Sequence, residues 1–262
     1  MEELLAAAPA FLLLATRALG MIEVSPLLSS DTVSQVVKVA LAGLSAYAAF
    51  PTAQVYGDVS VFGLNFALLV VGEGLIGVIM GFFINVVFAA FATAGQFFSL
   101  QMGFAASEIF DPLTQEEHPL MGQYLNLVAM LVFLSLDGFR ELFLGGFWRS
   151  VQSISIVSMV NGREHIIGMI LAGLSRLFLD AVIISMPIMG TLFLTSLATG
   201  LVSKASPQIN ILSEGFPISI TTAFILVFFT LPFMTVAFSR VVDSGFSTLE
   251  LLFALIGEQI GG

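Results

Sequence analysis

The sequence predicts an all-α integral membrane protein made of helical hairpins and long, kinked helices. Of its 262 residues, 58% are hydrophobic and only 10% are charged, whereas charged residues make up about a quarter of an ordinary soluble domain. Several apolar stretches reach the roughly 20 residues that a helix needs to cross a hydrocarbon core about 30 Å thick. A β-barrel would alternate in polarity over segments of about ten residues, but the stretch 182–201 is uncharged and mainly apolar on every face.

The charge and the cysteine content of the chain exclude further classes of protein and of binding site. The net charge is −10 and the pI is about 4.4. The 8 basic residues are scattered, so the clustered cationic surface that binds a phosphate backbone is missing. We interpret the acidic excess as the solvated ends of helices. Because the chain has no cysteine, neither a disulfide framework nor a thiolate metal site is available.

Two helices are expected before residue 51. The first covers 4–28, and we interpret it as a retained helix because the start of the chain lacks the basic region of a secretory signal. Arg17 and Glu23 also interrupt its apolar stretch. The second helix is expected over 32–50, where Pro51 ends it because proline disfavours helix in the residue before it.

The next apolar segment, 59–103, is too long for one simple span. As a continuous helix it would reach about 65 Å, roughly twice the hydrocarbon thickness. Either it projects well beyond the bilayer, or it is broken near Gly72-Glu73-Gly74, where two glycines flank a carboxylate. The polar segment 107–119 follows and contains two prolines, so we expect a loop there.

The second half of the chain predicts three further helical segments and a tail. The arm 120–151 carries charges between Asp137 and Glu141, which indicate a turn or a charge cluster at membrane level. A long apolar run then extends to Val202, and a break at 206–208 precedes a further span over 215–242. Apolar residues at helical spacing over 243–258 predict an amphipathic terminal helix.

Glycine spacing favours close helix packing over nucleotide binding. The run Gly72-Glu73-Gly74-Leu75-Ile76-Gly77 fits G-x-G-x-x-G, but a dinucleotide site also needs a βαβ unit and an acidic residue about 20 positions further on. Gly77 and Gly81 form G-x-x-x-G, which lets two helix backbones approach closely. The partner helix could be internal or belong to another subunit.

Several charges interrupt the apolar segments, where a charge is costly unless it is paired, protonated or facing water. A transport or proton pathway would use such groups. For Arg176 and Asp180, four residues apart, a local ion pair is the simpler interpretation. The interrupting residues are Glu73, Asp137, Arg140, Arg176 and Asp180.

No arrangement typical of an enzyme is present in the sequence. His118 and His165 lie in separate polar segments and neither belongs to H-E-x-x-H. A nucleophile elbow and a phosphate-binding loop are also missing. An intramembrane aspartyl protease would need Asp137 and Asp180 side by side, and no further motif supports that pairing. We therefore predict a protein that is not an enzyme and holds no cofactor or metal.

Short motifs are distributed along most of the chain. In chain order they are Gly72-Glu73 with Gly77, Gln101-Met102-Gly103, Asp111-Pro112, Pro119, Ser206-Pro207-Gln208-Ile209-Asn210 and Gly215-Phe216-Pro217. Together they resemble the FliR family of flagellar type III export-gate membrane proteins, which is homologous to the SctT family of injectisomes. The most specific motif is S-P-Q-I-N-x-x-x-x-G-F-P, in which Ser206 replaces the family's more familiar alanine.

The resemblance implies a structural subunit of a flagellar protein-export gate. One copy would assemble with several FliP and FliQ subunits, next to FlhB-like and FlhA-like components, and pass unfolded flagellar subunits. The gate would lie among lipid in the bacterial inner membrane, within the flagellar basal body and raised toward the periplasm. Alternatives are the equivalent injectisome subunit and a small-solute transporter.

The resemblance also divides the chain and assigns its site residues. One helical domain over 1–262 would comprise a FliP-like part at about 1–202, with a plug loop at 103–119, and a FliQ-like hairpin at about 203–262. Phe104, Ile109 and Phe110 would occlude the gate, although Glu108 departs from a purely apolar plug. The implied plug residues are Gly103, Phe104, Ile109, Phe110, Asp111 and Pro112; the family-motif residues are Pro207, Gln208, Asn210, Gly215, Phe216 and Pro217; the residues of helix packing or a helix break are Gly72, Glu73, Gly77 and Gly81.

Overall fold

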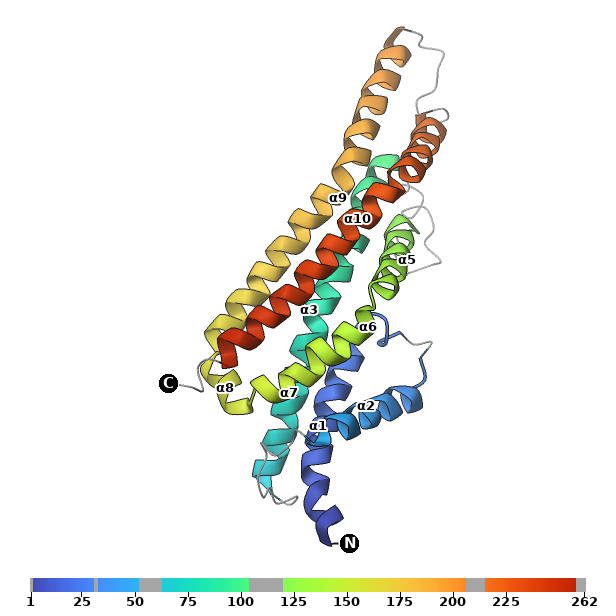
Figure 1. The fold of residues 1–262 in the computed structure, drawn as a ribbon. Coiled ribbons are helices and arrows are strands. Elements are labelled where there is room, and N and C mark those ends of the chain that lie inside the picture. The colour runs from blue at the N-terminus through green and yellow to red at the C-terminus, as the bar shows by residue number, and fades with distance from the viewer. Residues whose placement is uncertain (1, 31–32, 52–62, 104–119, 206–214, 258–262) are drawn as a thin grey trace. The chain divides into compact units, whose positions relative to one another are not determined.

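A computed structural model describes residues 2–30, 33–51, 63–103, 120–205 and 215–257, and within these ranges all regular structure is helical (Figure 1). The helices in chain order are α1 Glu2–Val24, α2 Gln35–Ala49, α3 Leu64–Met102, α5 Leu120–Ser135, α6 Gly138–Arg140, the π-helix η2 Glu141–Trp148, α7 Arg149–Ser153, α8 Ile156–Asn161, α9 Arg163–Ala205 and α10 Phe216–Gly257. By length and composition α3, α9 and α10 can each cross a membrane. The predicted all-α membrane class is therefore confirmed.

The chain folds into two compact units, each assembled from segments that are distant in sequence. Unit 1 comprises Met1–Val87, Leu134–Leu174 and Val242–Gly262. Unit 2 comprises Phe88–Phe133 and Ser175–Val241. The long helices α3, α9 and α10 each contribute one part to unit 1 and another to unit 2.

In unit 1, α1 and α2 pack together through small and apolar side chains. Ala42, Ala46 and Ala49 recur on one face of α2 and are buried, as expected for a helix stripe of period 3.6. Buried Lys38 donates hydrogen bonds from Nζ to the Glu23 carboxylate at 3.1 Å and to the Ser29 carbonyl at 3.3 Å. These bonds fix the start of α2 against the end of α1.

Unit 1 also contains the irregular stretch between α5 and α9. Asp137 adopts a left-handed conformation with φ 55°, which ends the preceding helix. Of the two alternatives for the 120–151 arm, the structure therefore has the turn. Further along, the Ser155 hydroxyl accepts a hydrogen bond from the Ser158 N–H at 3.1 Å, and the Ser158 hydroxyl accepts one from the Ser155 N–H at 3.0 Å. This reciprocal capping box starts α8.

Unit 2 packs α3 against α5 and α10. The rings of Phe88 in α3 and Phe133 in α5 lie edge to face with centroids 5.4 Å apart. The ring of Phe91 in α3 lies 4.2 Å from that of Phe238 in α10. A Cβ on Gly95 would lie 2.5 Å from the Met121 carbonyl oxygen, so the backbones of α3 and α5 are in close contact.

Of the two alternatives for the segment 59–103, the structure has the unbroken helix, since α3 runs through Gly72-Glu73-Gly74 without a break. One expectation about helix continuity is wrong. The tail is no separate amphipathic helix, since α10 continues from Phe216 to Gly257. Gly245, which could have ended the span, lies in the helix, where an added Cβ would overlap the Val87 side chain. Leu252 and Phe253 beyond it are buried in unit 1.

Candidate functional site

The candidate site in unit 1 is built on a close crossing of α1 and α3. A Cβ on Gly20 would lie 2.6 Å from the Gly74 carbonyl oxygen, and one on Gly81 would lie 2.7 Å from the Met21 carbonyl oxygen. A Cβ on Gly77 would overlap the Arg17 carbonyl oxygen. Only glycine allows backbones to approach this closely, so the structure pairs the G-x-x-x-G face with α1 of the same chain.

A buried ion pair lies at this crossing. Arg17 Nε donates to Glu73 Oε2 at 2.5 Å, and both side chains are 1% exposed. An isolated charge at this depth would be very costly, but two opposite charges in contact offset much of that cost. The carboxylate between two glycines in α3 therefore has its partner on α1.

The Arg17 guanidinium extends the contact to a third segment. Nη1 lies 3.4 Å from the Ser150 hydroxyl, and Nη2 donates to the Ile154 carbonyl at 3.1 Å. Ser150 in turn donates to the Phe147 carbonyl at 2.7 Å. Ile154 has extended backbone angles between α7 and α8, which places its carbonyl where an arginine from α1 can reach it. One side chain thus links α1, α3 and the α7–α8 connection.

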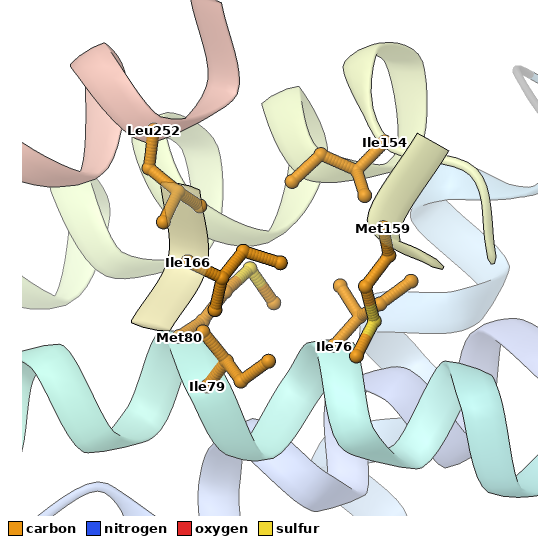
Figure 2. Close-up of a pocket in the computed structure, with 7 residues that line it drawn as sticks. All are labelled: Ile76, Ile79, Met80, Ile154, Met159, Ile166 and Leu252. Atoms are coloured by element: carbon orange, nitrogen blue, oxygen red, sulfur yellow. The ribbon is translucent and has the colours of Figure 1, made fainter. Parts of the chain in front are cut away.

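A small apolar cavity lies beside this network in unit 1 (Figure 2). Its volume is about 10 Å³, on the scale of a single water, whereas ligand sites usually measure hundreds of cubic ångströms. Every lining side chain is aliphatic or a thioether, so the space offers no polar group for chemistry. The lining residues are Ile76, Ile79, Met80, Ile154, Met159, Ile166 and Leu252.

The other charges singled out in the sequence lie elsewhere. Asp137 and Arg140 are exposed in unit 1. In unit 2, Arg176 and Asp180 form the expected local ion pair, with Nε and Oδ2 3.8 Å apart. Asp137 and Asp180 therefore belong to different units. Within the described ranges, no group of three or more His, Cys, Asp or Glu residues could hold a metal ion.

The motif residues are only partly covered by the structure. Gly72 lies against the Ile156 side chain of α8. In unit 2, Gly103 follows the last residue of α3 and meets the ring of Phe216, while Phe216 and Pro217 open α10 directly after Gly215. The plug and motif residues outside the described ranges are Phe104, Ile109, Phe110, Asp111, Pro112, Pro207, Gln208 and Asn210.

Sequence reasoning missed Arg17 and Ser150 as members of the site. The available signal was charge complementarity, because Arg17 and Glu73 each stand within a long apolar stretch and carry opposite signs. Ser150 gave no signal, since a lone serine is unremarkable in an apolar helix. Arg17 and Glu73 are 56 positions apart in the chain, and only tertiary packing brings them together.

Comparison with known proteins identifies the family. The chain matches the family described as "Bacterial export proteins, family 1" over residues 8–245. It is 34% identical over 198 residues to flagellar biosynthetic protein FliR of Borreliella burgdorferi, covering 75% of this chain and 74% of that protein. It is 30% identical over 251 residues to FliR of Bacillus subtilis, covering 95% and 96%. It is also 26% identical over 217 residues to surface presentation of antigens protein SpaR of Shigella flexneri, covering 82% of each. The chain therefore belongs to family 1 of the bacterial export proteins, the family of FliR.

Proposed function

We propose that this chain is a structural, non-enzymatic subunit of a flagellar type III export gate. The observation that carries the proposal is similarity to flagellar FliR over 95% of this chain and 96% of the relative. Similarity over nearly the whole length supports a shared role for the whole chain, because a match limited to one domain would cover only part of it. We place the gate in the bacterial inner membrane at the flagellar basal body, raised toward the periplasm, where unfolded flagellar subunits pass through it.

Exposed apolar surface supports assembly with partner subunits. The most apolar window of α3 is 61% buried, but the corresponding windows of α9 and α10 are only 28% and 17% buried. Apolar faces this extensive need lipid or other helices to cover them. We propose that FliP-like and FliQ-like subunits cover them, around one copy of this chain, with FlhB-like and FlhA-like components nearby.

The distribution of charge supports the same arrangement. In the described part of unit 2, charged residues are restricted to Arg176, Asp180, Lys204 and Arg240. Between them, 181–203 of α9 and 216–239 of α10 carry no charge, and each would measure about 35 Å as a helix.

We further propose a FliP-like part over about 1–202 and a FliQ-like hairpin over about 203–262.

Within this function we assign residues 103–119 the role of a plug. Apolar side chains at a constriction exclude water and ions until a substrate displaces them, and Phe104, Ile109 and Phe110 would act in this way. Deleting residues 105–117 should raise ion conductance when the assembled gate is placed in planar bilayers. Unchanged conductance, with assembly intact, would remove the plug role.

The flagellar branch is favoured over the injectisome branch. The FliR proteins of Borreliella burgdorferi and Bacillus subtilis are 34% and 30% identical to this chain, whereas SpaR is 26% identical. Genes for hook, rod and filament proteins beside the gene for this chain would support the flagellar branch. Genes for effectors and a needle there would support the injectisome branch.

Native mass spectrometry tests the proposed function directly. The tagged chain is purified in mild detergent from its own cells, and the mass of the complex is measured. We expect one copy of this chain together with FliP-like and FliQ-like subunits. A lone monomer or homodimer that mediates solute uptake after reconstitution would favour a small-solute transporter instead.

A further inference from the structure

Buried residues recur at every fourth position along the helical stretch 138–153 of unit 1, which joins α6, η2 and α7 without a gap. The buried positions are Gly138, Leu142, Gly146 and Ser150. Successive residues of an α-helix are about 100° apart, so a spacing of four drifts by about 40° at each step. From Gly138 to Ser150 the buried face of an α-helix would turn by about 120°.

The π-helix η2, Glu141–Trp148, counteracts this drift. Its N–H groups bond to carbonyls five residues back, so each turn holds more residues than the 3.6 of an α-helix. Positions four apart then stay nearly aligned, and one face can lie against α1, on which η2 packs. Leu142 near the start of η2 and Ser150 after its end are both fully buried, so the face continues into α7.

This alignment brings two hydrogen-bond acceptors to Arg17 of α1. Arg17 donates from Nη1 to the Ser150 hydroxyl at 3.4 Å and from Nη2 to the Ile154 carbonyl at 3.1 Å. The Ile154 N–H donates to the Ser150 carbonyl at 2.9 Å, which ties the two acceptors together. The Ile154 side chain also lines the small cavity with Ile76 and Met80 (Figure 2). A rotation of α7 would therefore remove both acceptors from Arg17 and alter the cavity wall.

We propose that the stretch 138–153 is a two-register element and that Arg17 holds it in the π register. π-helices are rare, so the same sequence without tertiary contacts favours the α register. The π register is then maintained by the buried guanidinium, which is 1% exposed and needs the acceptors that α7 supplies. The element lies within unit 1 and does not depend on the proposed export role.

Arg149 adds a second reason for the π register. If α7 changed to the α register, its residues would turn by about 100° relative to those before η2, each to the place of the next one. Arg149 would then leave its partner Glu250 on α10. It would take the place of Ser150 beside the Arg17 guanidinium. Arg17 thus opposes the α register both by losing acceptors and by repelling another arginine.

A single cysteine reports the register in the full-length protein in detergent, because the chain has no cysteine of its own. Val151 is 3% exposed, whereas Gln152 is exposed. Val151→Cys should therefore react slowly with a water-soluble maleimide, and Gln152→Cys should react quickly in every variant. In the α register, position 151 takes the exposed place of 152. Arg17→Met/Glu73→Leu should speed labelling of Val151→Cys about 10- to 100-fold, the factor that corresponds to a hydrogen bond with a charged group.

Deletion of Gly145 from η2 separates a change of register from general loosening. A π turn that loses one residue has the length of an α turn, and the deletion cancels the displacement by one place. The α register then keeps Ser150 on the buried face. In this background Arg17→Met/Glu73→Leu should leave Val151→Cys protected. Faster labelling both with and without the deletion would indicate loosening and would overturn the proposal.

Leu142→Cys covers the case in which the residues before α7 turn while α7 stays in place. Leu142 is fully buried, and it would move to the exposed place of Glu141. If both cysteines stayed protected in Arg17→Met/Glu73→Leu, apolar packing alone would hold the π register, and the role of Arg17 would be disproved.

Deletion of Gly43 from α2 is the matched control for deletion of Gly145. Gly43 also belongs to unit 1, and a Cβ there would meet nothing within 4 Å. Because α2 is a regular α-helix, losing one residue turns Ala46 and Ala49 away from α1 by about 100°. The melting temperature should fall for this deletion and stay unchanged for that of Gly145. Equal losses would overturn the two-register element, and this comparison needs no change at Arg17.

Discussion

At the residue scale, the Arg17–Glu73 pair of unit 1 places two charges in the interior, and neither charge is tolerated there without the other. Both side chains are 1% exposed, so each charge depends on the other and on the hydrogen bonds around it. Desolvation can offset the attraction between such ions, and a well-packed apolar pair is often as stable. Removing one partner alone is much worse, since the remaining charge stays buried without compensation.

We therefore expect Arg17→Met to lower the free energy of unfolding by about 3–5 kcal/mol. The double variant Arg17→Met/Glu73→Leu should recover most of that loss, because it leaves no buried charge. Thermal unfolding of the purified protein in detergent measures both changes.

A more exposed ion pair in unit 2 provides the control for this prediction. The Arg176 side chain is 61% exposed and that of Asp180 is 19% exposed, with Nε and Oδ2 3.8 Å apart. Arg176→Met should cost less than about 1 kcal/mol, as is typical of pairs near the surface. If Arg17→Met proved no more harmful than Arg176→Met, the buried pair would not be a structural requirement.

The sequence identified one half of this site and not the other. Glu73 was recognisable, because a carboxylate within an apolar helix needs a partner, and Gly77 and Gly81 showed the spacing of a packing face. Arg17 could not be assigned to Glu73, since the pairing depends on where α1 crosses α3. That crossing is set by the backbone contacts of glycines in both helices, and one-dimensional spacing does not encode it.

At the element scale, helix ends were predictable where proline or a polar segment marks them. The predicted end of the second helix at Phe50 lies one residue beyond the last residue of α2, Ala49, as expected before Pro51. Continuity of α3 and α10 was not predictable, because a glycine within an apolar helix signals either a break or a close contact. At Gly72 and Gly245 the structure has a close contact, with the side chains of Ile156 and Val87. Only the position of the neighbouring segment decides between a break and a contact.

Gly77→Ala tests whether the α1–α3 crossing depends on missing side chains. The new Cβ would strike the Arg17 backbone, which cannot rotate away as a side chain could, and the two helices would have to separate. We expect a loss of about 1–3 kcal/mol of stability, the usual cost of overpacking. The melting temperature in detergent measures the change.

Gly168→Ala serves as the control for this substitution. Gly168 lies within α9, and an added Cβ there meets nothing within 4 Å. Alanine should therefore be neutral or stabilise the helix by up to about 1 kcal/mol through its better helix propensity. If Gly77→Ala and Gly168→Ala lowered stability equally, α1 and α3 could move apart without a measurable loss of stability.

At the scale of the whole molecule, the chain buries the Arg17–Glu73 pair in unit 1 and leaves apolar faces on α9 and α10 uncovered. Hydroxyls on α9 are satisfied locally, as in the bonds from Thr195 to the Thr191 carbonyl and from Thr199 to the Thr195 carbonyl, both at 3.0 Å. Such bonds within one helix suit either lipid or a neighbouring helix. A hydropathy pattern could predict that these helices are apolar, but it could not say what covers them.

Spin labels can distinguish lipid from partner helices on these faces. The chain has no cysteine, so a single introduced cysteine gives a unique attachment site. Leu194 and Phe228 are exposed within the uncharged parts of α9 and α10. In the isolated chain in bilayers, labels there should collide often with oxygen, which dissolves in lipid, and rarely with a water-soluble nickel chelate.

In the assembled gate, the proposed partners should cover both positions, so oxygen collisions should fall and nickel collisions should stay low. A label at Arg163, an exposed position at the start of α9, should remain open to the nickel chelate in both states. Oxygen access that persists at Phe228 after assembly would identify a face in contact with lipid, because a helix packed against that position excludes the small apolar probe. Nickel access at Phe228 in the isolated chain would instead indicate a face lined by water, which an uncharged stretch of this length does not support.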